Sequence, residues 1–354
     1  MNPMRTLVIL LVIGGCAVGT EIPSTDKPVV GAPNPMAPGV NPVPTTPTGP
    51  TTPTPTTPVG VSMAGRGGDV SGPVTPTTPT TPTTPTTPTT PTAPTTPTVP
   101  GKMTPTIPEI KGECPEFRSG TVSLMGVSGI TVAAGAKAAG PTAPFVSYWH
   151  GTGSFAGEYS GMASAVAQGV MSEGGVLVSF SGSSGVGDSS CSGTFIFSLG
   201  DMDVTDQFVA CAVKNHNVDP RRIYSTGCSA GGLFSACLAA RRSNYIAASA
   251  PNSGGFTFPQ MFQNDWTPAL MTMHGGSSDV VIVNFTMTSA TADKAFKDRG
   301  GFVINCNHGG THCGGGGLSK DVWEFFKAHP YGIEASPWKD ALPSGFSTQC
   351  KLYM

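Results

Sequence analysis

Short runs of apolar and β-branched residues alternate with amphipathic stretches from residue 113 to residue 354. The apolar runs predict eight strands, at residues 121–124, 130–133, 145–149, 176–180, 222–226, 246–250, 269–273 and 302–306. The amphipathic stretches predict five helices, at residues 159–170, 204–215, 229–242, 290–297 and 319–328. Alternating strands and helices are typical of a mostly parallel sheet with helices on both faces. We therefore expect one α/β domain over residues 113–354.

Residues 17–112 show no such periodicity. Within them, residues 75–100 are an almost unbroken Thr-Thr-Pro repeat. Proline at every third position favours the polyproline II conformation, and a segment without an apolar face cannot build a core. We expect residues 16–112 to form a disordered Thr/Pro-rich tether that acts as a spacer for the domain.

The first residues have the features of an export signal. Arg5 precedes an apolar run at residues 7–13 that is too short to cross a bilayer, and the run ends in Gly14-Gly15-Cys16. Small residues before a cysteine are the pattern of a bacterial lipoprotein signal; the alternative is an ordinary secretory signal. We predict a signal peptide at residues 1–15 and lipidation of Cys16. Two acyl chains on Cys16 would attach the protein stably to a membrane.

Composition narrows the class of partner and the compartment. Charged residues make up 11% of the 354 residues and the net charge is −2, with no basic cluster, which argues against a nucleic-acid partner. Of the nine cysteines, removing Cys16 leaves an even set, which indicates disulfides in an exported domain. The set is Cys114, Cys191, Cys211, Cys228, Cys237, Cys306, Cys313 and Cys350. Parity alone does not fix how they pair.

The segment Gly227-Cys228-Ser229-Ala230-Gly231 matches G-x-S-x-G, the pattern of a nucleophile elbow. A predicted strand precedes it and a predicted helix follows it, which is the setting that exposes a serine hydroxyl to a histidine. The first N–H groups of that helix also favour negative charge beside the serine. Ser229 is therefore the predicted nucleophile; the alternative is a glycine-rich turn without a catalytic role.

In the α/β-hydrolase order the acid and then the base follow the serine. Asp279 lies in the loop after the predicted strand at 269–273, where a carboxylate could orient an imidazole and stabilise its protonated form. Asp265 is the alternative, but it precedes that strand. We expect Asp279 to be the acid.

Two histidines in the loop after the last predicted strand, His308 and His312, compete for the role of base. Cys228 is adjacent to Ser229, and Cys313 is adjacent to His312. A disulfide between these cysteines would join nucleophile and base directly, so we prefer His312. Closing such a long loop would also restrict the unfolded chain, by roughly 4–5 kcal/mol on the entropy model.

The same loop admits a second interpretation. Cys306, His308, His312 and Cys313 resemble the ligands of a zinc ion. Adjacent His312 and Cys313 fit one tetrahedral ion poorly, and the sequence lacks the His-Glu helix of metalloproteases. We therefore expect no metal and no other cofactor.

An upstream loop supplies groups that could bind an oxyanion. The predicted strand at 145–149 leads into His150-Gly151-Thr152-Gly153. In the hydrolase fold one N–H comes from the residue after the nucleophile, here Ala230, and another from the loop after the third strand. Gly151 or Thr152 is the predicted second donor; the alternative is a plain strand–helix turn.

Together these motifs resemble one group of hydrolases. The HGTG loop, residues 218–232 around Ser229 and residues 323–326 are similar to secreted polyhydroxybutyrate depolymerases and feruloyl or acetylxylan esterases of the α/β-hydrolase superfamily. The resemblance covers most of residues 115–330 and implies hydrolysis of carboxylic esters through an acyl-enzyme, without a metal. The order Cys-Ser, Asp, His-Cys is similar to that of tannases and feruloyl esterases, in which those cysteines are disulfide-bonded.

The chain departs from tannases in one respect. Only 50 residues separate Ser229 from Asp279, which leaves no room for a large lid. The sequence thus predicts an exported cell-envelope lipoprotein, displayed on the surface, that hydrolyses feruloyl or acetyl esters of polysaccharide, or polyhydroxyalkanoate polyester. A non-catalytic surface binding protein with the same fold and a serine peptidase are the alternatives. Asp203, Asp206 and Asp219 are expected to be capping and structural residues.

Overall fold

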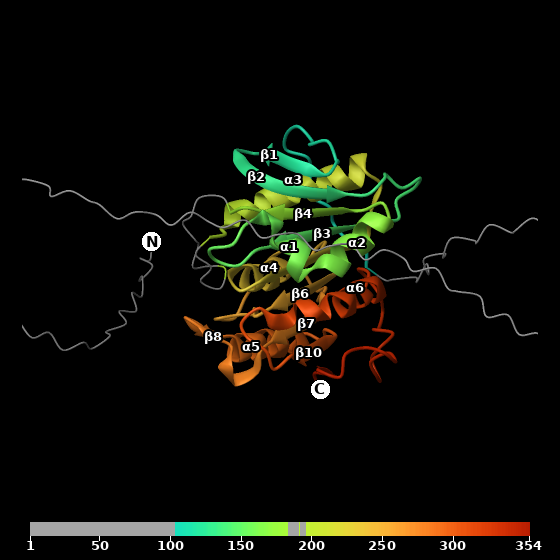
Figure 1. Cartoon of the computed structure of the whole chain (residues 1–354). Coiled ribbons are helices and arrows are strands. Elements are labelled where there is room, and N and C mark those ends of the chain that lie inside the picture. Colours follow the sequence, from blue (N-terminus) through green and yellow to red (C-terminus); the bar gives the residue numbers. More distant parts are fainter. Residues whose placement is uncertain (1–102, 183–190, 192–195) are drawn as a thin grey trace, which may run out of the picture. The chain divides into compact units, whose positions relative to one another are not determined.

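The computed structural model describes residues 103–182, 191 and 196–354 (Figure 1). The predicted signal peptide, the predicted lipidation site Cys16 and most of the predicted tether lie outside the described residues. The packed region begins earlier than the predicted boundary at residue 113. Thr106 N donates to Asn244 O at 2.8 Å, and Ile107 packs against the hydrophobic core. The predicted tether is therefore too long at its C-terminal end, because these contacts depend on residues far away in the sequence.

A nine-stranded sheet forms the centre of the described domain, in the order β1-β2-β4-β3-β5-β6-β7-β10-β11. The strands from β4 to β10 in this order are parallel, whereas β1, β2 and β11 pair antiparallel with their neighbours. A separate hairpin pairs β8 with β9. The strands are β1 Gly120–Leu124, β2 Val127–Ala134, β3 Ala143–Trp149, β4 Val176–Phe180, β5 Val218–Cys228, β6 Ala248–Asn252, β7 Ala269–His274, β8 Val280–Val281, β9 Val283–Asn284, β10 Val303–Asn307 and β11 Cys350–Leu352.

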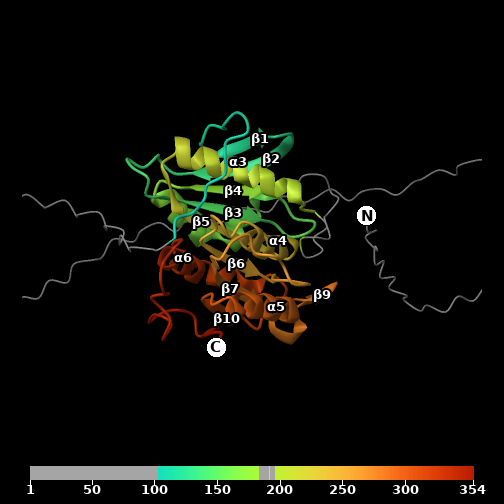
Figure 2. The same ribbon diagram turned by 180° about the vertical axis from the view of Figure 1, so that it is seen from behind.

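Helices cover both faces of the sheet. They are α1 Tyr159–Met162, α2 Ser164–Ser172, α3 Leu199–Asn215, α4 Ala230–Arg241, α5 Phe285–Asp298 and α6 Ser319–Ala328, with short 3₁₀ turns η1 Ala156–Glu158, η2 Gly276–Ser278 and η3 Gly314–Leu318. α2 and α6 cover one face, and α3, α4 and α5 cover the other (Figures 1 and 2). No helix of the described residues is long and apolar enough to cross a bilayer.

The core has two layers because the central strands bury both of their faces. On β3, Phe145 and Trp149 join the cluster under α3, α4 and α5, whereas Val146 and Tyr148 join the cluster under α2 and α6. A strand buried on both faces forms a continuous apolar run instead of an alternating one. This explains why the parallel strands were predictable from short apolar runs.

The predicted fold class is confirmed: a mostly parallel sheet lies between two layers of helices. The predicted helix at 159–170 is two helices, because the chain leaves helical geometry at Ala163 (φ −131°, ψ 34°). α5 starts before the predicted residue 290, because the Asn284 side chain accepts from Met287 N at 3.1 Å and caps the helix. The sequence missed β8, β9 and β11, since strands of two or three residues carry no periodicity.

Four disulfides cross-link the described residues. They join Cys114 to Cys211, Cys191 to Cys237, Cys228 to Cys313 and Cys306 to Cys350. The last of them fastens β11 to β10, where the two residues face each other in the antiparallel register. Because Cys306 and Cys313 are both oxidised, the thiolate ligands that the zinc interpretation requires are not available.

The three aspartates expected to be structural have structural partners. Asp206 accepts from Arg242 Nε at 2.8 Å, and Asp203 pairs with Nη2 of the same guanidinium at 3.5 Å. Asp219 accepts from Arg221 N at 2.8 Å at the start of β5. The bonds to Arg242 hold α3 against the end of α4, and the bond within residues 219–221 stabilises the first turn of the chain in β5.

Asp293 of α5 is a buried carboxyl group that has no cationic partner among the described residues. It accepts from Thr272 Oγ1 at 2.8 Å and from Asn305 Nδ2 at 2.7 Å, and its exposed fraction is 0%. Burial raises the pKa of Asp293 to about 7, although the Asn305 and Thr272 bonds act in the opposite direction. The group therefore stays protonated in the folded protein at pH values where the unfolded chain has lost that proton.

This difference predicts that Asp293 weakens the fold as the pH rises. Between about pH 4 and pH 7 the folded state binds more protons, so the unfolding free energy should fall by up to about 1.4 kcal/mol per pH unit. Asp293→Asn should remove this dependence and should be the more stable protein at pH 8. Thermal unfolding of both proteins at pH 5, 6, 7 and 8 measures it; parallel curves at all four values would contradict the assignment.

Candidate active site

Ser229 occupies a sharp turn between β5 and α4. Its backbone has φ 58° and ψ −121°, a strained conformation for a residue with a side chain. A Cβ atom at Gly227 would overlap Trp149 O, and one at Gly231 would overlap the same oxygen. Only glycine permits so close an approach, so both glycines of the motif are required by packing against the end of β3.

The turn is also fixed by β6. Ser229 N donates to Asn252 O at 3.0 Å, at the last residue of that strand. Leu233 N donates to Ser229 O at 2.8 Å, which starts the hydrogen-bond pattern of α4. Ser229 therefore stands at the N-terminus of a helix, where the unpaired N–H groups produce a positive potential.

Asp279 is a fully buried carboxylate with three donors. His312 Nδ1 lies 2.7 Å from its Oδ1, and Ser253 Oγ and Gly275 N donate to its Oδ2 at 2.7 and 3.0 Å. Burial alone would raise the pKa of Asp279, but the Gly275 N–H and the bonds from His312 and Ser253 outweigh it and hold the pKa below its ordinary value. An ionised carboxylate at this position fixes the orientation of the imidazole.

The His312 ring is held on two sides. Asp279 binds its Nδ1, and the Phe285 ring lies 4.6 Å away, centroid to centroid, at an angle of 38°. The side chain keeps 26% of its surface exposed, so its other nitrogen remains accessible. Cys313, the next residue, is disulfide-bonded to Cys228, with the two Cα atoms 5.8 Å apart.

The disulfide therefore joins the residue before Ser229 to the residue after His312. Among the described residues no hydrogen bond connects Ser229 Oγ with His312, but the two neighbouring backbones are covalently tied. Hydrogen bonds of this kind are often long in the absence of substrate and tighten when it binds. Ser229, Asp279 and His312 thus all follow the C-terminal ends of parallel strands, β5, β7 and β10.

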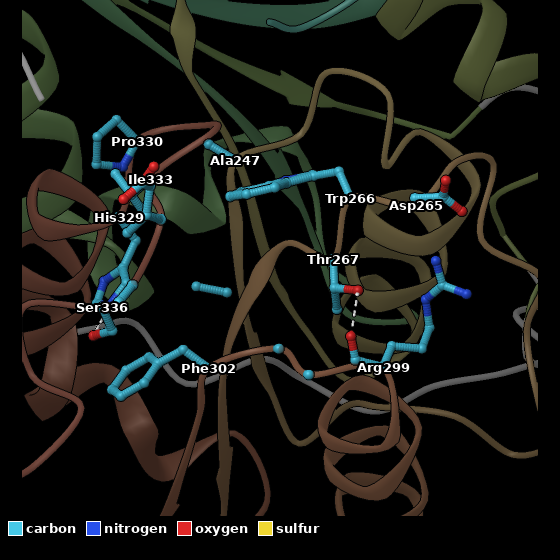
Figure 3. Close-up of a pocket in the computed structure, with 15 residues that line it drawn as sticks. Ala247, Asp265, Trp266, Thr267, Arg299, Phe302, His329, Pro330, Ile333 and Ser336 are labelled. Carbon is cyan, nitrogen blue, oxygen red and sulfur yellow. Dashed lines mark hydrogen bonds between the residues drawn. The ribbon is translucent and has the colours of Figure 1, made fainter. Parts of the chain in front are cut away.

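Neither rival residue is hydrogen-bonded to Asp279, Ser229 or His312 among the described residues. His308 Nδ1 accepts from Gly310 N at 3.2 Å, and no hydrogen bond joins it to Asp279 among the described residues. Asp265 is exposed and lines a pocket of about 210 Å³ with Trp266, Thr267 and Arg299 (Figure 3). This pocket lies where β6, β7 and β10 begin, whereas Ser229, Asp279 and His312 follow the ends of strands.

The predicted oxyanion donors do not all remain available. The Gly151 N–H donates to Glu158 Oε2 at 3.0 Å, so in this structure it is already engaged. The Thr152 N–H has no hydrogen-bond partner among the described residues, and Thr152 is exposed. Ala230 N is the first amide of α4, which has no partner within its helix. Of the two alternatives left by the sequence, the structure leaves Thr152 free and Gly151 engaged.

Sequence reasoning missed Ser253. Its Oγ donates to Asp279 Oδ2 at 2.7 Å and accepts from Cys313 N at 2.9 Å, so it connects the loop of the acid with the loop of the base. The residue is fully buried and has φ 42°. Its place just past the end of β6, a position where polar residues of parallel sheets gather at sites, was the one available signal.

No protein-family model and no curated protein matches this chain. Solved structures do match it. The native form of a protein named pOPH gives a TM-score of 0.51 at 16% identity, over 68% of this chain and 97% of that one. A serine-to-alanine variant of pOPH, solved as a complex with pNPB, gives 0.53 at 15% identity, over 69% and 97%. At such identities the similarity shows the fold, that of α/β-hydrolases.

Proposed function

We propose that this protein is a serine hydrolase that cleaves carboxylic esters, with Ser229 as nucleophile, His312 as base and Asp279 as acid. The observation that carries the proposal is the 2.7 Å bond between His312 Nδ1 and the buried Asp279 carboxylate, at a histidine tied by a disulfide to the strained Ser229 turn. A structural loop has no need of a buried ionised carboxylate aimed at a partly exposed imidazole.

The reaction would proceed in two stages. His312 Nε2 takes the Ser229 proton as Oγ attacks the ester carbonyl, and the N–H groups of Ala230 and Thr152 bind the negative oxygen. The alcohol leaves with the proton from His312, which forms an acyl-Ser229. Water, deprotonated by His312, then attacks the acyl group, and the acid is released as Ser229 recovers its proton.

Feruloyl or acetyl esters of polysaccharide and polyhydroxyalkanoate polyester are the two candidate substrates. The hairpin that follows Asp279 favours the polyester. Val280 and Val281 are 53% and 47% exposed, and Ile282 at its tip is 86% exposed. Phe285 N donates to Asp279 O at 2.9 Å, which closes this apolar hairpin directly beside the acid. An apolar surface next to a site suits an apolar polymer better than a hydrated polysaccharide.

We also propose that the protein is exported and anchored through lipid at Cys16, with residues from Cys16 onward forming a spacer on the cell surface. The four disulfides support export, because such cross-links persist in oxidising compartments. Attachment at Cys16 would place a membrane at the start of the spacer and the ester substrate outside the cell.

A substrate panel tests the function. The full-length protein, produced in an oxidising compartment, is assayed with p-nitrophenyl acetate and butyrate, a feruloyl ester, a polyhydroxybutyrate film and peptide p-nitroanilides. We expect turnover of the nitrophenyl esters and of the polyhydroxybutyrate film, in preference to the feruloyl ester. Cleavage of anilides in preference to esters would indicate a peptidase instead, and a folded protein inactive on every compound would point to a binding role.

A further inference from the structure

Glu158 lies beside the proposed catalytic serine but has no part in the proposed reaction. Its Oε2 accepts two hydrogen bonds, from Gly151 N at 3.0 Å and from Tyr148 OH at 3.0 Å. A Cβ atom placed on Gly151 would lie 3.6 Å from Glu158 Oε1 and 3.4 Å from Ser229 Cβ. The carboxylate and the serine therefore flank the same backbone position.

The loop between these residues is a closed unit. Ser154 N donates to Gly151 O at 3.0 Å and Gly153 has φ 81°, which forms a tight turn. Glu158 N donates to Phe155 O at 3.0 Å, so the loop then enters a 3₁₀ turn. The hydrogen bond that Gly151 N donates to Glu158 Oε2 brings the end of this turn back to the beginning of the loop.

The anchor of the carboxylate is rigid. Tyr148 belongs to β3 and its side chain is 1% exposed, so its hydroxyl has a fixed position. Burial raises the pKa of Tyr148 well above its ordinary value, and the neighbouring Glu158 raises it further. Tyr148 therefore remains a proton donor to Glu158 across the working pH range.

We propose that Glu158 is a positioning residue that anchors the HGTG loop through the Gly151 N–H and so presents the Thr152 N–H to the oxyanion. This inference rests on the proposed function. Because the carboxylate accepts the Gly151 N–H, the Thr152 N–H is the one of these two amides that remains for the substrate. It also adds a negative charge near the site, so its benefit must come from geometry, because charge alone would oppose an oxyanion.

Two substitutions separate geometry from charge. Glu158→Ala removes the acceptor, so the loop loses its anchor; since removing an oxyanion donor costs about 10²–10³ in kcat, we expect a loss of about 10- to 100-fold. KM for p-nitrophenyl butyrate should change less than about threefold, because the donor acts mainly in the transition state. Glu158→Gln keeps an oxygen that can accept both bonds, and its kcat should stay within about threefold of the unmodified protein.

A second readout does not depend on activity. Amide hydrogen exchange in peptides covering residues 150–157 should become faster in Glu158→Ala and remain unchanged in Glu158→Gln. Glu116→Ala serves as the matched control, because the Glu116 side chain is 77% exposed and, among the described residues, its ion pair is with Arg118 alone. It should alter neither kcat nor exchange.

The outcomes are distinct. Wild-type kcat and exchange in Glu158→Ala would overturn the inference, and an equal loss in Glu158→Gln would show that charge acts instead of anchoring. If Glu158→Ala does not fold, Tyr148→Phe takes its place; it removes one of the two bonds and should lower kcat by about three- to tenfold with KM preserved. An unmodified protein inactive on all esters would refute the proposed function, while the exchange data would still decide the anchoring.

Discussion

Replacing Ser229 with alanine is expected to lower kcat for p-nitrophenyl butyrate by at least about a thousandfold. The variant keeps the backbone turn but has no oxygen to form the acyl-enzyme. Some turnover above that of water should remain, because the amides of Ala230 and Thr152 and the Asp279–His312 pair are still present. Initial-rate assays of the unmodified and variant proteins, made and purified in parallel, measure this loss.

Covalent labelling makes the prediction specific to the residue. A fluorophosphonate should modify the unmodified protein once, at Ser229, and should not modify the variant. Ser172→Ala is the matched control, because Ser172 lies exposed on α2 with its hydroxyl bonded to Gly169 O at 2.8 Å. It should retain full activity and labelling. Full activity in Ser229→Ala would mean that the turn has been wrongly assigned as the nucleophile elbow.

A feature of the fold or of the site could be predicted from the sequence where it depends on residues that are close together in the chain. The Ser229 turn was predictable because its two glycines, the strand before it and the helix after it are all contiguous in the chain. Asp279 is predicted as the acid from the order of elements, since it lies in the loop after β7, just past η2. Both inferences used rules that involve a few neighbouring residues and the course of the chain.

Ser253 and Glu158 could not be predicted in the same way. Ser253 acts by contacting Asp279 and Cys313, which come from two other loops. Glu158 acts by contacting Gly151 and Tyr148, and the sequence gives no sign that the chain folds back there. For the same reason the sequence left Gly151 and Thr152 as equal alternatives, because only the tertiary contact shows which amide is engaged.

The errors at the level of the fold have the same origin. The tether was extended to residue 112 because its composition is low in complexity, yet Ile107 reaches the core. β11 was missed because three residues carry no pattern, although the disulfide from Cys350 to Cys306 fastens it to the sheet. In both cases a long-range contact overrides weak local preference.

Replacing His312 with alanine should have an effect comparable to the loss of Ser229, again at least about a thousandfold in kcat. In the proposed mechanism the imidazole takes the serine proton, and Asp279 cannot replace it because Asp279 is fully buried. His308→Ala is the matched control from the same loop. It should keep activity within about threefold, since His308 bonds to Gly310 N and not to Asp279 among the described residues.

The pair of variants decides between two histidines that spacing could not separate. Removing His312 also leaves Asp279 without one of its three donors, so part of the loss could reflect a damaged fold. Thermal unfolding and fluorophosphonate labelling of both variants resolve this: a folded His312→Ala protein that labels far more slowly has lost its base. A large loss in His308→Ala with activity retained in His312→Ala would transfer the role to His308. The bond to Asp279 would then be structural, and the reason for linking Cys228 to Cys313 would be stability of the loop.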